Sequence, residues 1–267
     1  MSLSRLPYPR KRFSQNFLID QNIVKKIVAR AALRPDETVV EIGPGRGALT
    51  GALCQVASRV LAIEIDTELF HYLQQDLTHY SNLELSLGDA LAYPYQTLPP
   101  KTVVVANLPY NISTPLLFTF FEARGSIDRM ILMVQLEVAK RLVGKTGTRD
   151  YGVLSVLAQY FADVDLAFKV SRTCFRPRPD VESAIVELRL KPVDEMDSPE
   201  DIAQFIRVVK AAFSHRRKTL LNAMRDAGMA ANVLKSVFDG TGIHGGRRAE
   251  TLTVQDFQRL ARVLLYR

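Results

Sequence analysis

Cysteine is scarce in this chain, and long apolar runs are missing. The two cysteines, Cys54 and Cys174, form no CxxC motif, and the four histidines do not cluster. A disulfide framework and a cysteine-based zinc site are therefore excluded, and a reducing compartment is favoured. No apolar run reaches the roughly 18 residues of a transmembrane helix, and residues 1–12 lack the apolar core of a secretory signal. We expect a cytoplasmic protein with no metal site and no membrane contact.

Charge and composition are those of a folded protein with a basic balance. Of the 267 residues, 47% are hydrophobic and 24% are charged, which excludes disorder or a collagen-like structure for the whole chain. The net charge of +7 is uneven: residues 1–36 carry +6, residues 37–191 carry −2 and residues 192–267 carry +3. A near-neutral middle between basic ends suggests a catalytic body that contacts a polyanion, such as nucleic acid, through its ends. The alternative is a set of solvated charged faces.

Apolar segments typical of buried strands alternate with helical patterns over the first 190 residues. Strands are predicted at 38–42, 59–65, 83–87, 102–106, 130–134, 164–170 and 184–190. This alternation favours an α/β fold with a mostly parallel, doubly wound sheet. An acidic linker with two prolines, at 192–199, precedes a part where only helices are predicted, at 199–213, 215–226, 230–238 and 253–265. We therefore expect two domains: residues 1–191, and a small all-helical domain of residues 192–267.

A glycine-rich turn follows the first predicted strand. Gly43, Gly45 and Ala48 satisfy the relaxed dinucleotide fingerprint, although so short a match is weakly specific. Glycines after a strand let the backbone approach a ligand closely, and the following helix offers free N–H groups. Glu41, two residues before the first glycine, and a third glycine at Gly47 depart from the pattern of a pyrophosphate site. The carboxylate suits a cationic or hydroxyl-rich ligand better.

Two further carboxylates follow at the ends of the next predicted strands. Glu64 comes 21 residues after Gly43, where a carboxylate can accept hydrogen bonds from ribose hydroxyls. Asp89 ends the third strand and can accept a hydrogen bond from an adenine amino group. Either residue alone is as readily a helix cap or a surface acid. Because they lie at the ends of successive strands beside the glycine turn, together they predict a nucleoside site.

The segment Asn107-Leu108-Pro109-Tyr110 closes the fourth predicted strand at the same edge of the sheet. An exocyclic adenine amine is a poor nucleophile, because its lone pair is delocalised into the ring. The Asn107 side-chain oxygen and the Leu108 carbonyl can accept its two hydrogens, which favours a tetrahedral nitrogen with its lone pair aimed at a methyl donor. Tyr110 can stack on the base. In isolation the segment is also compatible with a simple turn.

Taken together, these motifs resemble those of S-adenosylmethionine-dependent N6-adenine methyltransferases. Residues 11–18 (KRFSQNFL) and 175–183 (FRPRPDVES) narrow the resemblance to the rRNA adenine dimethyltransferase family, and residues 213–222 (FSHRRKTLLN) narrow it to the branch that acts on small-subunit (16S) rRNA. The resemblance extends from Arg10 to the end of the chain. It implies a Rossmann-like class I methyltransferase domain, S-adenosyl-L-methionine as cofactor, and dimethylation of N6 on two adjacent adenosines in a hairpin near the 3′ end of 16S rRNA.

The same resemblance implies roles for individual residues. Asn16 and Leu18 would line the methionine end of the cofactor, with Gly43 and Gly45 beneath it, Glu64 on the ribose and Asp89 on the adenine. Gln15, Glu41 and Asn107 complete the expected cofactor-binding set. The expected catalytic set is Asn107, Leu108, Pro109, Tyr110 and Phe175, with Phe175 covering the flipped base on the face opposite Tyr110. Ser14 stands where the family usually has glycine, so it is mildly strained if the position requires a positive φ.

Contacts with RNA phosphates are expected from basic residues at both ends of the chain: Arg10, Lys11, Arg12, Arg216, Arg217, Lys218, Arg247 and Arg248. The expected partner is 16S rRNA within a small ribosomal subunit or its precursor, bound by a monomer. One alternative is 23S rRNA dimethylation of the erythromycin-resistance type, but those enzymes usually lack the segment at 213–222. A second is a non-catalytic ribosome-assembly factor, disfavoured by the intact Asn107 and Tyr110. An NAD oxidoreductase is disfavoured because no catalytic His or Tyr-Lys pair is suitably placed.

Overall fold

The chain divides into two compact units. The computed structural model describes residues 7–10, 15–193 and 198–265. The first unit extends to Ala139 and includes Asp165–Pro192, while the second comprises Lys140–Val164 and the chain from Val193 onward. This division differs from the single boundary predicted at residue 192, because residues 140–164 pack against the C-terminal helices. The Tyr151 hydroxyl donates to the Leu252 carbonyl at 2.8 Å, and the Tyr160 ring stacks on Phe205 with 4.1 Å between ring centroids.

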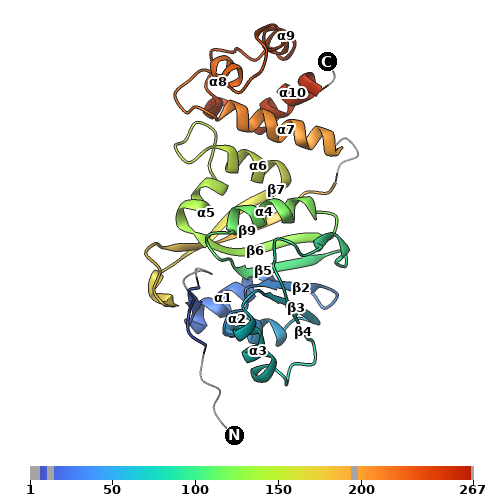
Figure 1. Ribbon diagram of the computed structural model, residues 1–267, viewed down its shortest axis with the longest axis vertical. Helices are drawn as coiled ribbons and strands as arrows, with labels where there is room; N and C mark the ends of the chain where they lie inside the picture. Colours follow the sequence, from blue (N-terminus) through green and yellow to red (C-terminus); the bar gives the residue numbers. More distant parts are fainter. Residues whose placement is uncertain (1–6, 11–14, 194–197, 266–267) are drawn as a thin grey trace. The chain divides into compact units, whose positions relative to one another are not determined.

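The first unit is built on a seven-stranded sheet in the order β4-β3-β2-β5-β6-β9-β7 (Figure 1). Strands β4, β3, β2, β5 and β6 are parallel, and β9 pairs antiparallel with β6. The predicted mostly parallel sheet is therefore confirmed. The strand order reverses between β2 and β5, the point at which open α/β sheets bind ligands. The strands are β2 (Thr38–Ile42), β3 (Arg59–Glu64), β4 (Leu83–Leu87), β5 (Thr102–Asn107), β6 (Ile127–Gln135), β7 (Ala162–Val170) and β9 (Ser183–Leu190).

Helices connect these strands. They are α1 (Gln21–Ala31), α2 (Ala48–Cys54), α3 (Thr67–Asp76), α4 (Ser113–Glu122), α5 (Leu136–Leu142) and α6 (Val153–Phe161). Asp20 caps α1, since its carboxylate accepts from the N–H of Asn22 at 2.8 Å and of Ile23 at 3.3 Å. The sequence pattern does not predict α4. Its N-cap residue, Ile112, makes no side-chain cap, and threonine and phenylalanine, which have weak helix propensity, fill half of it.

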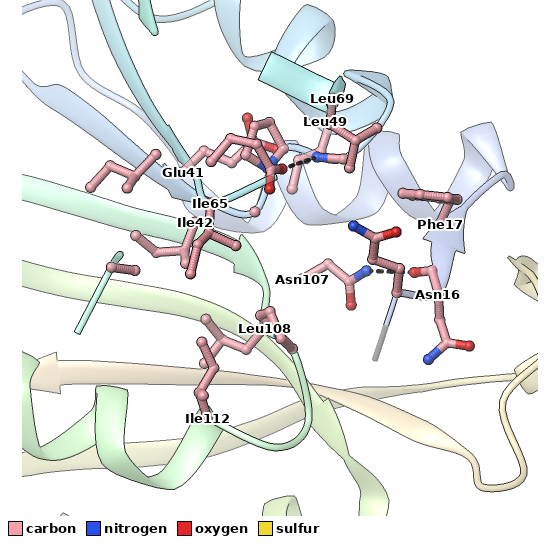
Figure 2. A pocket seen from close by; sticks show the side chains of 18 of the residues that line it. Asn16, Phe17, Glu41, Ile42, Leu49, Ile65, Leu69, Asn107, Leu108 and Ile112 are labelled. Carbon is pink, nitrogen blue, oxygen red and sulfur yellow. Dashed lines mark hydrogen bonds between the residues drawn. The ribbon is translucent and has the colours of Figure 1, made fainter. Parts of the chain in front are cut away.

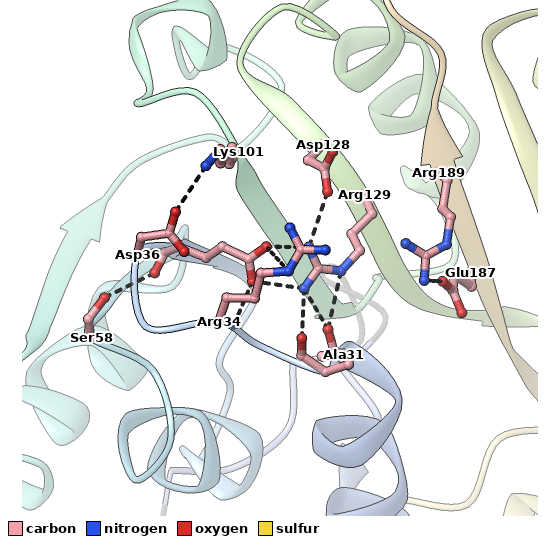
Figure 3. A network of polar contacts seen from close by, with 11 residues as sticks. Ala31, Arg34, Asp36, Ser58, Lys101, Asp128, Arg129, Glu187 and Arg189 are labelled. Atoms are coloured by element: carbon pink, nitrogen blue, oxygen red, sulfur yellow. Dashed lines mark hydrogen bonds and ion pairs between the residues drawn. The ribbon is translucent and has the colours of Figure 1, made fainter.

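A buried arginine on β6, Arg129, joins the end of α1 to the sheet (Figure 3). Arg129 on β6 is 3% exposed and donates to the two carboxylate oxygens of Glu37 at 2.6 and 2.8 Å. It also donates to the Ala31 carbonyl, from Nη2 at 2.8 Å and from Nε at 3.2 Å. Ala31 is the last residue of α1, so the guanidinium satisfies a carbonyl that has no partner within the helix. These contacts fix α1 at the edge of the sheet where the parallel strands begin.

Two very short strands hold the N-terminal arm, which is the segment of residues 10–18. Strand β1 (Phe17–Leu18) pairs antiparallel with β8 (Phe175–Arg176), in the register Leu18 opposite Phe175. The Ile19 amide also donates to the Cys174 carbonyl at 2.9 Å. The end of the arm is thus part of a small two-stranded sheet.

Besides α6, the second unit holds helices α7 (Pro199–Ala212), α8 (Leu220–Asp226), α9 (Ala231–Thr241) and α10 (Val254–Leu265). The prediction that a helix begins at residue 215 is wrong. Thr219 is the N-cap, and its hydroxyl accepts from the Asn222 amide at 3.4 Å, so α8 begins at Leu220. Short 3-10 helices lie at Tyr95–Thr97, Arg172–Cys174 and Ala249–Thr251. Within the described residues, no helix has the length and apolar character needed to span a membrane.

Candidate cofactor pocket and active site

A pocket opens at the carboxyl ends of β2, β3 and β5, where the strand order reverses (Figure 2). The arm closes one side of it through Asn16 and Phe17. The pocket brings together twelve of the residues predicted to bind cofactor or act in catalysis: Gln15, Asn16, Leu18, Glu41, Gly43, Gly45, Glu64, Asp89, Asn107, Leu108, Pro109 and Tyr110. Their individual roles stay predictions, but they surround one cavity.

The glycine turn can form only with glycines at the two positions that line the pocket. Gly43 and Gly45 have φ values of 64° and 60°, in the left-handed region that other residues rarely adopt. A Cβ on Gly45 would lie 2.9 Å from a ring carbon of Phe17, and one on Gly43 would contact the Pro109 ring at 3.8 Å. The bare backbone at Gly45 therefore lets the arm approach the turn, whereas Gly43 is required for its left-handed φ.

Glu64, at the end of β3, is 4% exposed and holds the glycine turn in place. One carboxylate oxygen accepts from the Gly45 amide at 3.3 Å, and the other accepts from the Asp66 amide at 2.9 Å. Burial raises the pKa of Glu64 above its usual range, although these amide hydrogen bonds act in the opposite direction. Each oxygen keeps a further lone pair, so the carboxylate can still accept hydrogen bonds from ligand hydroxyls.

Glu41, on β2, is the most unusual group in the pocket. It is 2% exposed, and its Oε2 has no hydrogen-bond partner among the described residues. Burial raises the pKa of Glu41 to about 8; nearby Thr50 lowers it, and the charge of Glu64 raises it further. A buried acceptor without a partner costs free energy unless a ligand pairs with it. The residues therefore fit S-adenosylmethionine, which carries ribose hydroxyls, an ammonium and a sulfonium charge.

Asn107, the last residue of β5, is oriented by the arm. Its side-chain nitrogen donates to the Asn16 carbonyl at 3.1 Å, so its oxygen points away from the arm (Figure 2). The Leu108 amide donates to the Met133 carbonyl on β6 at 3.1 Å, which fixes the peptide that follows. The orientation of the Asn107 amide depends on Asn16, which is far away in sequence, and motif spacing alone does not predict it.

The sequence motifs do not predict several apolar residues that line the pocket. Phe17, Ile65 and Leu69 line the pocket beside predicted residues (Figure 2), and the Phe17 ring lies 4.5 Å from the Arg46 guanidinium. Their only signal in the sequence is adjacency, since Phe17 lies within the arm motif and Ile65 follows Glu64 directly.

Phe175 lies apart from the other predicted catalytic residues. The sequence places it over the target base, but in the structure it is 2% exposed and does not line the pocket. It belongs to a core cluster that also contains Leu18, Val24 and Ile27. The pairing of β8 with β1 explains this, because it turns the Phe175 side chain inward and leaves the next residue, Arg176, exposed. Phe175 therefore packs against the core in this structure, and its role over the target base stays a prediction.

The predicted RNA contacts of the arm are only partly described. Lys11, Arg12 and Ser14 lie outside the described residues. The guanidinium of Arg10 forms ion pairs with Asp66 at 3.3 Å and with Glu68 at 2.6 Å. Its backbone amide also donates to the Gln15 side chain at 2.7 Å. Arg10 thus anchors the arm to the start of α3, and a phosphate would compete with two carboxylates for it.

The five basic residues of the second unit that are predicted to contact RNA lie on loops, and most of them have protein partners. Arg216 donates to the Arg149 carbonyl at 2.7 Å, and Lys218 pairs with Asp226. Arg247 donates to the Thr251 carbonyl, and Arg248 lies 4.0 Å from Glu250. Arg217 is exposed, and no partner for it is found among the described residues. The helix predicted to present the segment 216–218 is replaced by a turn before α8.

The chain matches one known protein family over almost its whole length. The family model described as "Ribosomal RNA adenine dimethylase" matches residues 8–265. The proteins called ribosomal RNA small subunit methyltransferase A from Moorella thermoacetica and Geobacter metallireducens are 44% and 40% identical to this chain. Each alignment covers 96% of this chain, with 92% and 95% of the respective relatives.

Two solved structures are also similar over nearly the whole chain. A dimethyladenosine transferase from Plasmodium falciparum has a TM-score of 0.79 at 27% identity, covering 91% of this chain and 95% of that protein. The 23S rRNA methyltransferase ErmE has a TM-score of 0.71 at 27% identity, covering 93% of this chain and 99% of that protein. From the near-complete family match and the identity to its curated relatives, this chain belongs to the ribosomal RNA adenine dimethylase family.

Proposed function

We propose that this protein transfers methyl groups from S-adenosylmethionine to N6 of two adjacent adenosines in a hairpin near the 3′ end of 16S rRNA, two groups to each. Family membership supports the chemistry, and the small-subunit name of its curated relatives supports the choice of rRNA. The substrate is a small ribosomal subunit or its precursor, bound by a monomer in the cytoplasm, where ribosomal RNA is available.

The orientation of Asn107 carries the proposal. Because its nitrogen donates to the Asn16 carbonyl, its oxygen is available to accept a hydrogen from the exocyclic amine of adenine. The Leu108 carbonyl accepts the second hydrogen. The hydrogen bond from the Leu108 N–H to the Met133 carbonyl holds the backbone at this residue. Two acceptors draw the amine toward a tetrahedral geometry and free its lone pair for attack. No side chain need act as a base before attack, since the proton becomes acidic only after alkylation.

The cofactor supplies the electrophilic methyl group when bound. Glu64 holds its ribose hydroxyls, Asp89 accepts from its adenine amine, and the turn at Gly43 and Gly45 lets it approach the backbone. Glu41 adds a carboxylate next to the positively charged end. Gln15, Asn16 and Leu18 close the pocket from the arm.

Basic residues hold the RNA in this proposal. Arg217 is the exposed cation of the segment 216–218 with no partner among the described residues, and Arg216 and Lys218 flank it. Phosphate contacts of this kind set position and affinity, whereas the pocket selects the base. Flipping the target adenosine out of its stack costs a few kcal/mol, which the phosphate contacts and stacking on Tyr110 must offset.

A methyl-transfer assay with matched RNAs tests the proposal. Small-subunit and large-subunit rRNA fragments are incubated with the protein and an isotopically labelled methyl donor, and mass spectrometry then locates the label. We expect N6,N6-dimethyladenosine at two adjacent positions of the 16S fragment. Label in the 23S fragment alone would instead support the activity named for ErmE. RNA binding without any label would indicate a binding factor that kept the fold.

A further inference from the structure

The hydroxyl of Tyr110 is held by a residue from a distant part of the chain. The phenol oxygen of Tyr110 and the hydroxyl oxygen of Ser183 are 2.7 Å apart, and either can be the donor. Ser183 is the first residue of β9 and is fully buried. Tyr110 is only partly buried and lies in the loop between β5 and α4, where it lines the pocket. The contact thus joins a pocket residue to the sheet.

Ser183 is itself held rigidly. It pairs with Gln135 at the end of the antiparallel ladder between β6 and β9. Directly beyond it, the Leu136 amide donates to the Glu182 carbonyl at 2.9 Å. Because this ladder continues through seven residue pairs, the Ser183 hydroxyl has a fixed position relative to the sheet. Asn107 ends a strand of the same sheet, so Tyr110 and Asn107 share one rigid reference.

The Tyr110 residue is held at its backbone and at its phenol oxygen. At one end, Ser113 donates to the Tyr110 carbonyl at 3.1 Å and the Ile112 amide donates to the Pro109 carbonyl at 3.1 Å, which hold the backbone. At the other end is the bond to Ser183. A tyrosine side chain has two torsions, and its phenol oxygen lies on the axis of the second, so fixing this oxygen sets the first torsion and with it the position of the ring. Burial raises the pKa of Tyr110, so its hydroxyl stays protonated and able to form this bond.

We propose that Ser183 is a positioning residue, which holds the ring of Tyr110 at the place where the target adenine stacks. The proposal rests on the proposed methyl transfer to adenosine, and it adds a residue that does not line the pocket. Ordering the ring before RNA binds removes an entropy cost from the base-bound state. The Ser183 hydroxyl therefore acts on substrate binding and turnover through Tyr110, without touching the base.

A double-mutant cycle separates this role from a merely structural one. The variants are Ser183→Ala, Tyr110→Phe and the combination of both. The matched control is Ser126→Ala, which removes another buried hydroxyl, bonded to the Gln96 carbonyl at 3.0 Å just before β6 begins, at the opposite edge of the sheet. For each protein we would measure kcat and KM for RNA, the Kd for S-adenosylmethionine, the melting temperature, and the fluorescence of 2-aminopurine placed at the target position.

We expect Ser183→Ala and Tyr110→Phe each to lower kcat/KM for RNA by about three- to tenfold, the range of one net hydrogen bond. The double variant should be no slower than either single one, because both remove the same bond. Cofactor affinity should not change, and the change in 2-aminopurine fluorescence on binding should be smaller than with the unchanged protein. Ser126→Ala should lower the melting temperature without altering kcat/KM.

Three results would overturn the inference. Equal kcat/KM for Ser183→Ala and the unchanged protein, with a lower melting temperature, would make the hydroxyl purely structural. Additive losses in the double variant would mean that the two residues act separately. If the unchanged protein methylates no adenosine in small-subunit rRNA, the proposed function fails and the inference fails with it. The first two results leave the proposed function intact, so the failures are distinguishable.

Discussion

Asn107 is the residue on which the proposed chemistry depends most. Replacing it in Asn107→Ala removes the acceptor for the adenine amine and the bond to the Asn16 carbonyl. Because this interaction matters most in the transition state, the methyl-transfer rate should fall on the order of 100-fold, with little change in cofactor Kd. Single-turnover kinetics and calorimetry measure the two quantities. Asn107→Asp keeps an oxygen acceptor and should retain more activity; equal rates for Asn107→Ala and the unchanged protein would contradict the assigned role.

Glu41 offers a test of how the pocket balances stability against binding. Its pKa of about 8 in the folded protein lies above the ordinary value of 4.5, so the folded state favours the protonated form. Its contribution to stability is thus most favourable below pH 4.5 and disappears as the pH rises through 8. Glu41→Gln should raise the melting temperature more at pH 8.5 than at pH 5, roughly the two ends of this range, and should weaken cofactor binding.

Thermal unfolding at the two pH values and calorimetry with S-adenosylmethionine check this prediction for Glu41. Glu84→Gln, at an exposed position on β4, serves as the control and should change neither quantity appreciably. A pH-independent effect of Glu41→Gln on melting would mean that Glu41 is already ionised in the ligand-free protein.

At the scale of elements, Arg129 on β6 links α1 to the sheet, because it donates to the Ala31 carbonyl and pairs with Glu37 just before β2. Arg129→Leu would leave a buried carboxylate without its cation and should cost about 3–5 kcal/mol of unfolding free energy at neutral pH. Arg129 holds the pKa of Glu37 below its ordinary 4.5, so the pair stabilises above that pH and its effect disappears as the pH falls further. Denaturant unfolding at several pH values measures both effects.

The exposed pair between Lys101 and Asp36 is the matched control for Arg129. Both of its side chains are largely exposed, so Lys101→Met should change the unfolding free energy far less than Arg129→Leu does. A small decrease in stability for Arg129→Leu, similar to that of Lys101→Met, would show that the buried pair contributes little to holding α1.

Elements with local signals are predictable from the sequence, and those set by distant contacts are not. The parallel strands show as apolar runs, and the glycine turn and the acids at the strand ends follow from their spacing. Strand β1 has two residues and exists because of β8, more than 150 positions away, which also explains why Phe175 is buried. The start of α8 depends on a single threonine cap. The Asn107 amide and the Tyr110 side chain are positioned by Asn16 and Ser183, which belong to motifs far away in the sequence, and motif spacing does not show these pairings.

At the scale of the whole molecule, the basic segment of the second unit should govern the salt dependence of RNA binding. Replacing Arg216, Arg217 and Lys218 with glutamine should flatten the slope of log affinity against log salt concentration, by roughly 0.7–0.9 for each phosphate that the protein no longer neutralises. Because Arg216 and Lys218 also have protein partners, Arg217→Gln alone should account for much of the change. Cofactor binding should be unaffected.

Fluorescence anisotropy with labelled RNA over a range of salt concentrations measures this slope. Lys235→Gln, at an exposed position on α9, removes one charge elsewhere in the same unit and should leave the slope nearly unchanged. An unchanged slope for the triple variant would mean that residues 216–218 form only a solvated turn.

The number and position of methyl groups on the RNA test the central claim most directly. Unmethylated small ribosomal subunits would be incubated to completion with the protein and labelled S-adenosylmethionine, and the rRNA would then be digested and analysed by mass spectrometry. We expect four methyl groups per 16S molecule, as two adjacent N6,N6-dimethyladenosines, and far fewer when Asn107→Ala is used over the same time. Label on another base, on 23S rRNA, or on no RNA at all would contradict it.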